Sequence, residues 1–188
     1  KLDDKVKGAS QTIADSSGNG NNGTTVGSAL DCSVQGKIGG ACGFGGADST
    51  GDYVYRAATG ASDPLHIRGT ITMTAWIKTS ALKWNFIAST EYASFRVSNA
   101  GYLTFGANYT YQDSRWPTSN SFVADGKWHF VAGVYDGSKI SMYVDGANVY
   151  TNDYGSYLGM TNTDVSLNVT VGGVGAYSTS YFNGSLDD

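Results

Sequence analysis

The chain has 188 residues, of which 26 are glycine, 2 are proline, 40% are hydrophobic and 15% are charged. This composition excludes a coiled coil or a disordered tail, and no apolar run approaches the ~20 residues of a membrane-spanning helix, so we expect no membrane insertion. The formal net charge is −4 and the basic residues are scattered singly, which leaves no positive stripe for phosphates and predicts no nucleic-acid partner.

The acidic residues favour turns over helices. Glu91 is the only glutamate among the 16 acidic residues, and most aspartates stand beside Gly, Asn or Ser. Because helices favour glutamate over aspartate, we expect few or no helices.

The two cysteines, Cys32 and Cys42, flank a loop that contains three glycines. Such a loop is flexible enough to bring the two thiols together, so we predict a disulfide and an oxidising compartment. The alternative is two small buried thiols in a reducing compartment.

Alternation with period two, the pattern of a strand with one face in a core, recurs in the middle of the chain. Within 71–78 it places four apolar residues on one face: Ile71, Met73, Ala75 and Ile77. Residues 95–97 and 102–105 alternate in the same way around Asn99 and Gly101, which predicts a hairpin.

The strongest alternation lies in the second half of the chain. One predicted core-facing set is Trp128, Phe130, Ala132 and Val134. After the turn at Asp136 the next set is Ile140, Met142 and Val144, and a later strand carries Leu167, Val169 and Val171. Short strands separated by turns predict an all-β fold, an antiparallel two-sheet β-sandwich of the jelly-roll type.

Several motifs carry a resemblance to a known family. They are DSSGNGNNGT at 15–24, GKIGG at 36–40, DYV at 52–54, TMTAWIK at 72–78, DGKWHFVAGVYDG at 125–137, YVDG at 143–146 and FNGSLDD at 182–188. In this order the chain resembles the laminin-G-like (LamG) jelly rolls of the concanavalin A-like lectin/glucanase superfamily. Members usually carry a longer strand before the position of Leu2 and a last strand that continues past Asp188. We therefore expect one LamG-like domain over 1–188 that is trimmed at both termini. The alternative is a domain whose edge differs from that of the family.

The loop from Asp15 to Thr24 concentrates carboxylate, amide and carbonyl oxygens, the ligands that calcium prefers. The resemblance implies a structural calcium ion held by this loop together with acidic residues of the last strand. The expected ligands are Asp15, Asn19, Asn22, Asp187 and Asp188. The alternative is a loop whose Asn and Asp side chains only cap turns.

The sequence argues against catalysis. Glucanases of the resembled fold use paired carboxylates, typically in a Glu-x-Asp-x-x-Glu run on one strand, and a chain whose single glutamate is Glu91 cannot form that run. His66 and His129 are far apart in sequence, and His129 lies in a strand pattern where a packing role is expected. We therefore expect no enzymatic activity, and a glycoside hydrolase is the least favoured reading.

Aromatic residues in polar, loop-like surroundings are the remaining sequence feature that indicates a ligand-binding site. Sugar rings stack on aromatic faces while polar side chains bind their hydroxyl groups, so we predict a ligand platform. Its expected members are Trp84, Tyr109, Tyr111, Asp113, Arg115 and Trp116. The alternative is that these rings pack loops and sheet ends, and tyrosine-rich loops suit protein recognition equally well.

Together these features predict an extracellular or cell-surface, non-catalytic, calcium-binding recognition module. Its expected partner is a glycan or a cell-surface protein, in an adhesive role and as part of a larger surface protein. The alternative is a structural or assembly domain of a surface fibre or pilin-like protein without a ligand site.

Overall fold

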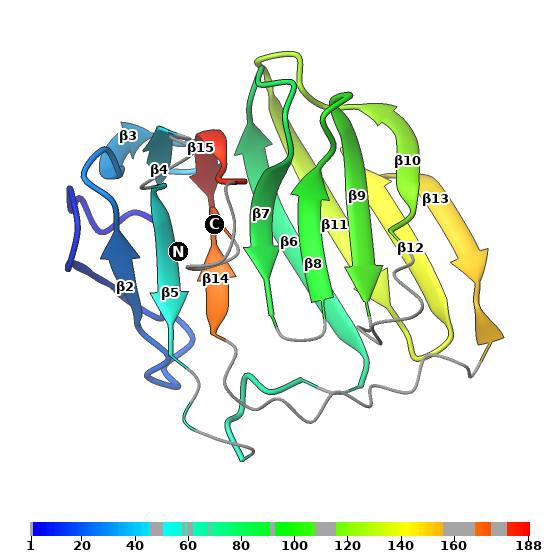
Figure 1. Cartoon of the computed structure of the whole chain (residues 1–188), viewed down its shortest axis with the longest axis horizontal. Coiled ribbons are helices and arrows are strands. Elements are labelled where there is room, and N and C mark those ends of the chain that lie inside the picture. The colour runs from blue at the N-terminus through cyan, green and yellow to red at the C-terminus, as the bar shows by residue number, and fades with distance from the viewer. Residues whose placement is uncertain are drawn as a thin grey trace.

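A computed structural model describes residues 2–45, 51–57, 59, 62–67, 69–90, 93–107, 116–155, 168–173 and 180–188. Within these ranges all named elements are β-strands, and they form two antiparallel sheets stacked face to face (Figure 1). The predicted all-β, two-sheet jelly-roll sandwich is thereby confirmed. The described part of the chain contains no helix long and apolar enough to cross a membrane.

The eight-stranded sheet faces the viewer in Figure 1. Its strands, in spatial order, are β1 (Thr12–Ile13), β2 (Gly23–Val26), β5 (Tyr53–Arg56), β14 (Val169–Val171), β7 (Asn85–Ser89), β8 (Ala93–Val97), β9 (Tyr102–Ala107) and β10 (Thr118–Phe122).

The seven-stranded sheet lies behind it. Its strands are, in spatial order, β13 (Ala147–Asp153), β12 (Lys139–Val144), β11 (Trp128–Tyr135), β6 (Ile71–Lys78), β15 (Asn183–Asp187), β4 (Gly40–Gly45) and β3 (Asp31–Gln35). The C-terminal strand β15 is inserted between β4 and β6, so the first and last parts of the chain share one sheet.

The core lies between the two sheets, as the alternation in 71–78 predicts. Ile71, Ala75 and Ile77 of β6 are buried, and Met73 packs against the same cluster. On the opposite side of the core, the neighbouring strands β8 and β9 contribute Phe95 and Phe105. Their rings meet edge to face with centroids 5.7 Å apart.

The predicted inner face of β11 is wrong. Val131 and Tyr135 point into the core cluster, whereas Trp128, Phe130 and Val134 lie on the outer face of the sheet. Both faces of this strand are apolar, so its period-two pattern carries no information about which one is buried. The register with β6 and β12, which pairs Val131 with Ala75 and Val144, decides it.

The structure contains the predicted disulfide between Cys32 and Cys42. It joins the neighbouring strands β3 and β4, and both cysteines are fully buried. Of the strand predicted to carry Leu167, Val169 and Val171, the part from Val169 to Val171 is β14, while Leu167 lies outside the described residues.

Candidate functional site

An outer-face surface of the eight-stranded sheet is the first candidate site. It lies at the end where β7 and β9 begin and β8 and β10 end, at the top of Figure 1. Phe95 and Val97 of β8 point into the core. Because side chains alternate between the faces of a strand, Arg96 between them points outward.

The Arg96 guanidinium is stacked against two tryptophans that its own sheet brings together. Its Cζ atom lies 4.4 Å from the ring centroid of Trp84 and 4.1 Å from that of Trp116, with Phe86 at 5.4 Å. Arg96 therefore holds the two indoles in place through cation–π contacts, worth about 0.5–2 kcal/mol each.

A second pair of rings continues this surface. Tyr102 of β9 and Phe122 of β10 are paired across the strands and meet edge to face, with centroids 5.7 Å apart. Phe122 is 46% exposed and Trp84 is 37% exposed. We call these five rings the aromatic row; its members are Trp84, Phe86, Tyr102, Trp116 and Phe122.

A hydroxyl group lies on the same face beside Arg96. Ser94 is two residues before Arg96 on β8 and is 5% exposed, and its Oγ has no hydrogen-bond partner among the described residues. A buried hydroxyl without a partner costs free energy, so a polar ligand atom that supplied the missing bond would be favoured.

The structure therefore unites part of the predicted ligand platform. Trp84 and Trp116 come together through Arg96. Tyr109, Tyr111, Asp113 and Arg115 lie outside the described residues, so their place in the platform stays a prediction. Sequence reasoning missed the contributions of Arg96, Tyr102 and Phe122. The signal that could have found Arg96 is its place in the predicted hairpin, between the core residues Phe95 and Val97. Tyr102 and Phe122 carry no comparable signal in the sequence.

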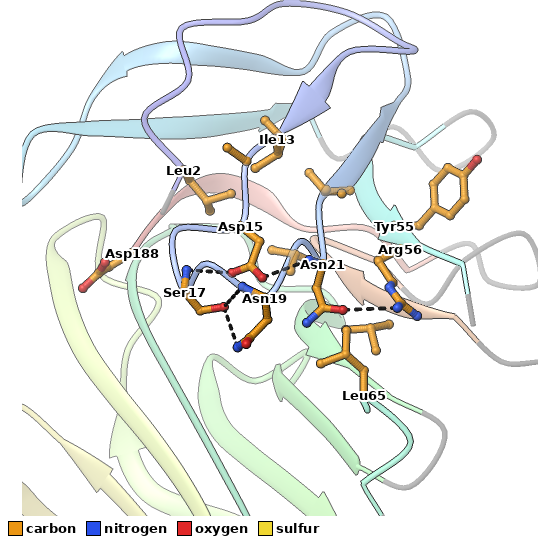
Figure 2. Close-up of a pocket in the computed structure, with 15 residues that line it drawn as sticks. Leu2, Ile13, Asp15, Ser17, Asn19, Asn21, Tyr55, Arg56, Leu65 and Asp188 are labelled. Carbon is orange, nitrogen blue, oxygen red and sulfur yellow. Dashed lines mark hydrogen bonds between the residues drawn. The ribbon is translucent and has the colours of Figure 1, made fainter. Parts of the chain in front are cut away.

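The predicted calcium loop lines a cavity of about 350 Å³ at the opposite side of the sandwich (Figure 2). Its apolar wall is formed by Leu2, Ile13, Val54, Leu65, Val169 and Val171. Its polar residues are Asp15, Ser17, Asn19, Asn21, Arg56 and Asp188.

Within this loop the Asp15 carboxylate closes two turns. Its Oδ1 accepts a hydrogen bond from the backbone N–H of Ser17 at 2.9 Å, and its Oδ2 accepts one from Asn21 at 3.0 Å. The hydrogen bonds from Ser17, followed by that from Asn21, hold the pKa of Asp15 below its usual value. The carboxylate is thus ionised at neutral pH, and it performs the turn-capping role of the alternative interpretation.

The five expected calcium ligands are not all in one place. Asp15, Asn19 and Asp188 line the cavity. Asn22 instead accepts a hydrogen bond from the Asp15 backbone N–H at 2.8 Å. Asp187 is buried on the outer face of the seven-stranded sheet, where its Oδ2 accepts the N–H of Ile38 at 2.7 Å.

The fit to a metal ion rests on donor chemistry alone. Asp15 and Asp188 bring two carboxylates to the cavity and Asn19 brings an amide oxygen, all hard ligands of the kind calcium takes. In the part of the chain that the structure describes, no three His, Cys, Asp or Glu side chains gather at one point. Calcium binding therefore stays a prediction.

A buried ion pair supports the same cavity and was not foreseen. Arg56 bonds the carboxylate of Asp63, whose side chain is 1% exposed, and its Nη2 donates to Asn21 Oδ1 at 3.1 Å. Burial raises the pKa of Asp63, but hydrogen bonds from Arg56, Thr59 and Leu65 outweigh it and leave that pKa well below the usual range. The charge of Arg56 is thereby neutralised. Asp15 and Asp188 are then the charged residues of the cavity that have no salt bridge to another described residue.

Comparison with known proteins places the chain in a superfamily. A laminin G type family model, described as the concanavalin A-like lectin/glucanases superfamily, matches residues 48–188. The chain belongs to this superfamily. No curated protein matches it by sequence.

Solved structures share the fold at low sequence identity. Domain 4 of an extracellular arabinanase from Geobacillus stearothermophilus, in complex with arabinotriose, is 16% identical with a TM-score of 0.65, over 93% of this chain and 84% of that one. A putative carbohydrate-binding protein from Bacteroides ovatus is 19% identical with a TM-score of 0.59, over 79% and 41% of the two chains. Domains LG4–5 of the mouse laminin α1 chain are 17% identical with a TM-score of 0.56, over 81% and 41%. The chain thus spans less than half of the last two.

Proposed function

We propose that this chain is a non-catalytic glycan-recognition module whose binding surface is the aromatic row. The observation that carries the proposal is the stacking of Arg96 on Trp84 and Trp116 at an outer sheet face, with Phe122 partly exposed on the same face. Aromatic faces accept the C–H faces of sugar rings, while the Arg96 and Ser94 polar groups suit sugar hydroxyls.

The comparisons support a carbohydrate ligand. The arabinanase domain was solved with arabinotriose, and the Bacteroides ovatus protein is described as carbohydrate-binding. At these identities the likeness establishes the fold, so the ligand remains a proposal that rests on the aromatic row. An adhesive role toward a cell-surface partner is the broader form of the same proposal.

The proposal also includes an extracellular location and a structural calcium ion. The Cys32–Cys42 disulfide supports the location, because disulfides persist in oxidising compartments. The oxygen donors of Asp15, Asn19 and Asp188 support the metal, and they would hold it at the cavity of Figure 2. When bound, the ion would neutralise the two carboxylates and tie the loop to the end of β15.

The test is binding to an array of immobilised polysaccharides that includes arabinan. We expect saturable binding that Trp84→Ala or Trp116→Ala weakens by about 1 kcal/mol, roughly fivefold in Kd, the scale of one lost aromatic contact. Trp128→Ala is the matched control, because Trp128 is a partly exposed tryptophan on the outer face of the other sheet.

Two results would contradict the proposal. One is the absence of binding to every polysaccharide on the array. The other is an equal loss of binding in Trp84→Ala and in the Trp128→Ala control. Self-association without glycan binding would instead support the surface-fibre assembly domain.

A further inference from the structure

We infer that the aromatic row binds an internal stretch of an oligosaccharide chain, with Tyr102 and Phe122 forming a second sugar subsite beside Trp84, Arg96 and Trp116. This inference rests on the proposed function and deepens it. It assigns the ligand class as a chain of at least three sugar units instead of a single terminal sugar.

Strand pairing sets the length of the row. Trp84 immediately precedes β7, Tyr102 begins β9, and Phe122 ends β10 opposite Tyr102, so all three lie at the same end of the sheet. Neighbouring strands are about 4.8 Å apart, which separates the backbones at Trp84 and Phe122 by about 14 Å. A single sugar ring is about as large as one aromatic ring and cannot contact both ends.

Phe122 is held in place and is still accessible. Its ring packs over Gly101, which has a φ of +85°, and a side chain at Gly101 would collide with that ring. Tyr102 meets the same ring edge to face, at an interplanar angle of 78°. A ring fixed in this way loses little conformational entropy when a ligand covers it, which favours binding.

The outward position of Phe122 separates it from the core. Its paired neighbour Tyr102 precedes Leu103, which is fully buried, so Tyr102 and Phe122 share the face opposite to the core. Nearly half of the Phe122 surface is exposed. The ring is therefore available for contacts that the fold itself does not use.

The position of β10 favours binding of an internal stretch of an oligosaccharide over binding of its terminal sugar. β10 is the last strand of the eight-stranded sheet, so the row leads from Trp84 across β8 and β9 to the edge of the sheet. A polymer lying on such a row can continue beyond the edge. The hydroxyls of its sugars would face Arg96 on β8, while Phe122 would contact an apolar sugar face at the edge of the sheet.

The test is calorimetry with ladders of arabinan, xylan, cellulose and galactan oligosaccharides, from one to six sugar units. We expect affinity to rise at least tenfold between the monosaccharide and the trisaccharide for the ladder that binds. Phe122→Ala should remove most of that gain, and Phe122→Tyr, which retains the ring, should keep it. Ile38→Ala is the control, because Ile38 is 55% exposed and lies at the β3–β4 turn of the other sheet.

The outcomes separate this inference from the proposed function. Binding in which the monosaccharide and the trisaccharide have equal Kd overturns the inference and leaves the proposed function in place. A gain with length that persists in Phe122→Ala overturns the assignment of Phe122. No binding to any ladder contradicts the proposed function itself. Melting temperatures of all variants exclude a loss of binding through unfolding.

Discussion

The Nδ1 atom of His129 lies 2.8 Å from Oδ2 of Asp145, so the first residues of β11 are tied to the turn between β12 and β13. The other ring nitrogen, Nε2, lies 3.0 Å from Oδ1 of Asp125, and the imidazole is only 15% exposed. The strand pattern predicts a packing role for His129, and the structure adds two carboxylate partners. A neutral imidazole has one N–H, so both contacts are hydrogen bonds only when His129 is protonated.

This arrangement predicts a loss of stability as the pH rises above the usual pKa of histidine, about 6.5. Burial lowers the pKa of His129, but the hydrogen bonds and charges of Asp145 and Asp125 outweigh it and raise that pKa above its usual value. Asp125 itself stays ionised, because hydrogen bonds from Lys127 lower its pKa. The stabilisation is therefore complete below the unfolded-state pKa of about 6.5 and is lost as the pH rises through the folded-state pKa.

Melting temperatures between pH 5 and 9, with an NMR titration of His129, measure this effect. Each tenfold increase in proton affinity is worth about 1.4 kcal/mol, or roughly 3–6 °C in a chain of this size. His129→Gln should flatten the profile, and Asp145→Asn, which suits the left-handed backbone at Asp145, should lower the titration midpoint. Identical pH profiles for wild type and His129→Gln would contradict the prediction, since His66 is the only other histidine.

The disulfide yields a second prediction. Cys32 and Cys42 are separated by ten positions and both are fully buried. In the chain-entropy model a loop of this length stabilises the fold by about 3 kcal/mol. Reduction, or the double change to serine, should lower the free energy of unfolding by about that amount, measured by urea denaturation. Free thiols in unfolded, unreduced protein would show that the bridge does not form.

The buried face of a strand can be predicted from the sequence only where polar residues occupy the opposite face. The strand at 71–78 is predictable because polar Thr72, Thr74 and Lys78 alternate with apolar residues. The strand at 128–135 is apolar on both faces, so its buried side depends on pairing with β6 and β12, which the sequence does not display.

The same reasoning applies to the aromatic row. Trp84 and Trp116 stand out in the sequence because their neighbours are polar. Tyr102 does not, because it begins an alternating strand and is indistinguishable from a core residue. Phe122 does not either, because it ends the otherwise polar segment 118–122, in which no alternation predicts a strand. Only the pairing of β9 with β10 brings their rings onto one outer face.

Calcium binding at the Asp15 loop is the third prediction. A ligand that binds only the folded state at a hundredfold excess over its Kd adds about 2.7 kcal/mol of stability. We therefore expect calcium to raise the melting temperature and a chelator to reverse the rise. Asp15→Asn, which keeps an acceptor oxygen for Ser17 but removes the charge, should abolish the response.

The control for this experiment is Asp153→Asn, a change in an exposed aspartate of β13 far along the chain from the loop. It should retain the full response to calcium. Two results together would show that the loop only caps turns. Elemental analysis would find no calcium in the protein, and neither calcium nor chelator would change its melting temperature.

The fourth prediction concerns the buried pair of Arg56 and Asp63. The Asp63 carboxylate accepts hydrogen bonds from Arg56 and from the backbone N–H groups of Thr59 at 2.7 Å and Leu65 at 2.9 Å. Removing one partner of a buried pair leaves the other charge uncompensated. Asp63→Asn should therefore lower the free energy of unfolding by about 3 kcal/mol in urea denaturation at pH 7.

The same carboxylate predicts the behaviour of the protein in acid. Because the folded-state pKa of Asp63 is lowered, its stabilisation is present above the unfolded-state pKa of about 3.9 and is lost as the pH falls through the folded-state pKa. Asp63→Asn should thus be less sensitive to acid than wild type. Asp153→Asn again serves as control, because the 3.7 Å pair of Asp153 with Lys139 is exposed and such surface pairs contribute about 0–1 kcal/mol. Equal losses of stability in the two variants would show that Asp63 contributes no more to stability than an exposed aspartate.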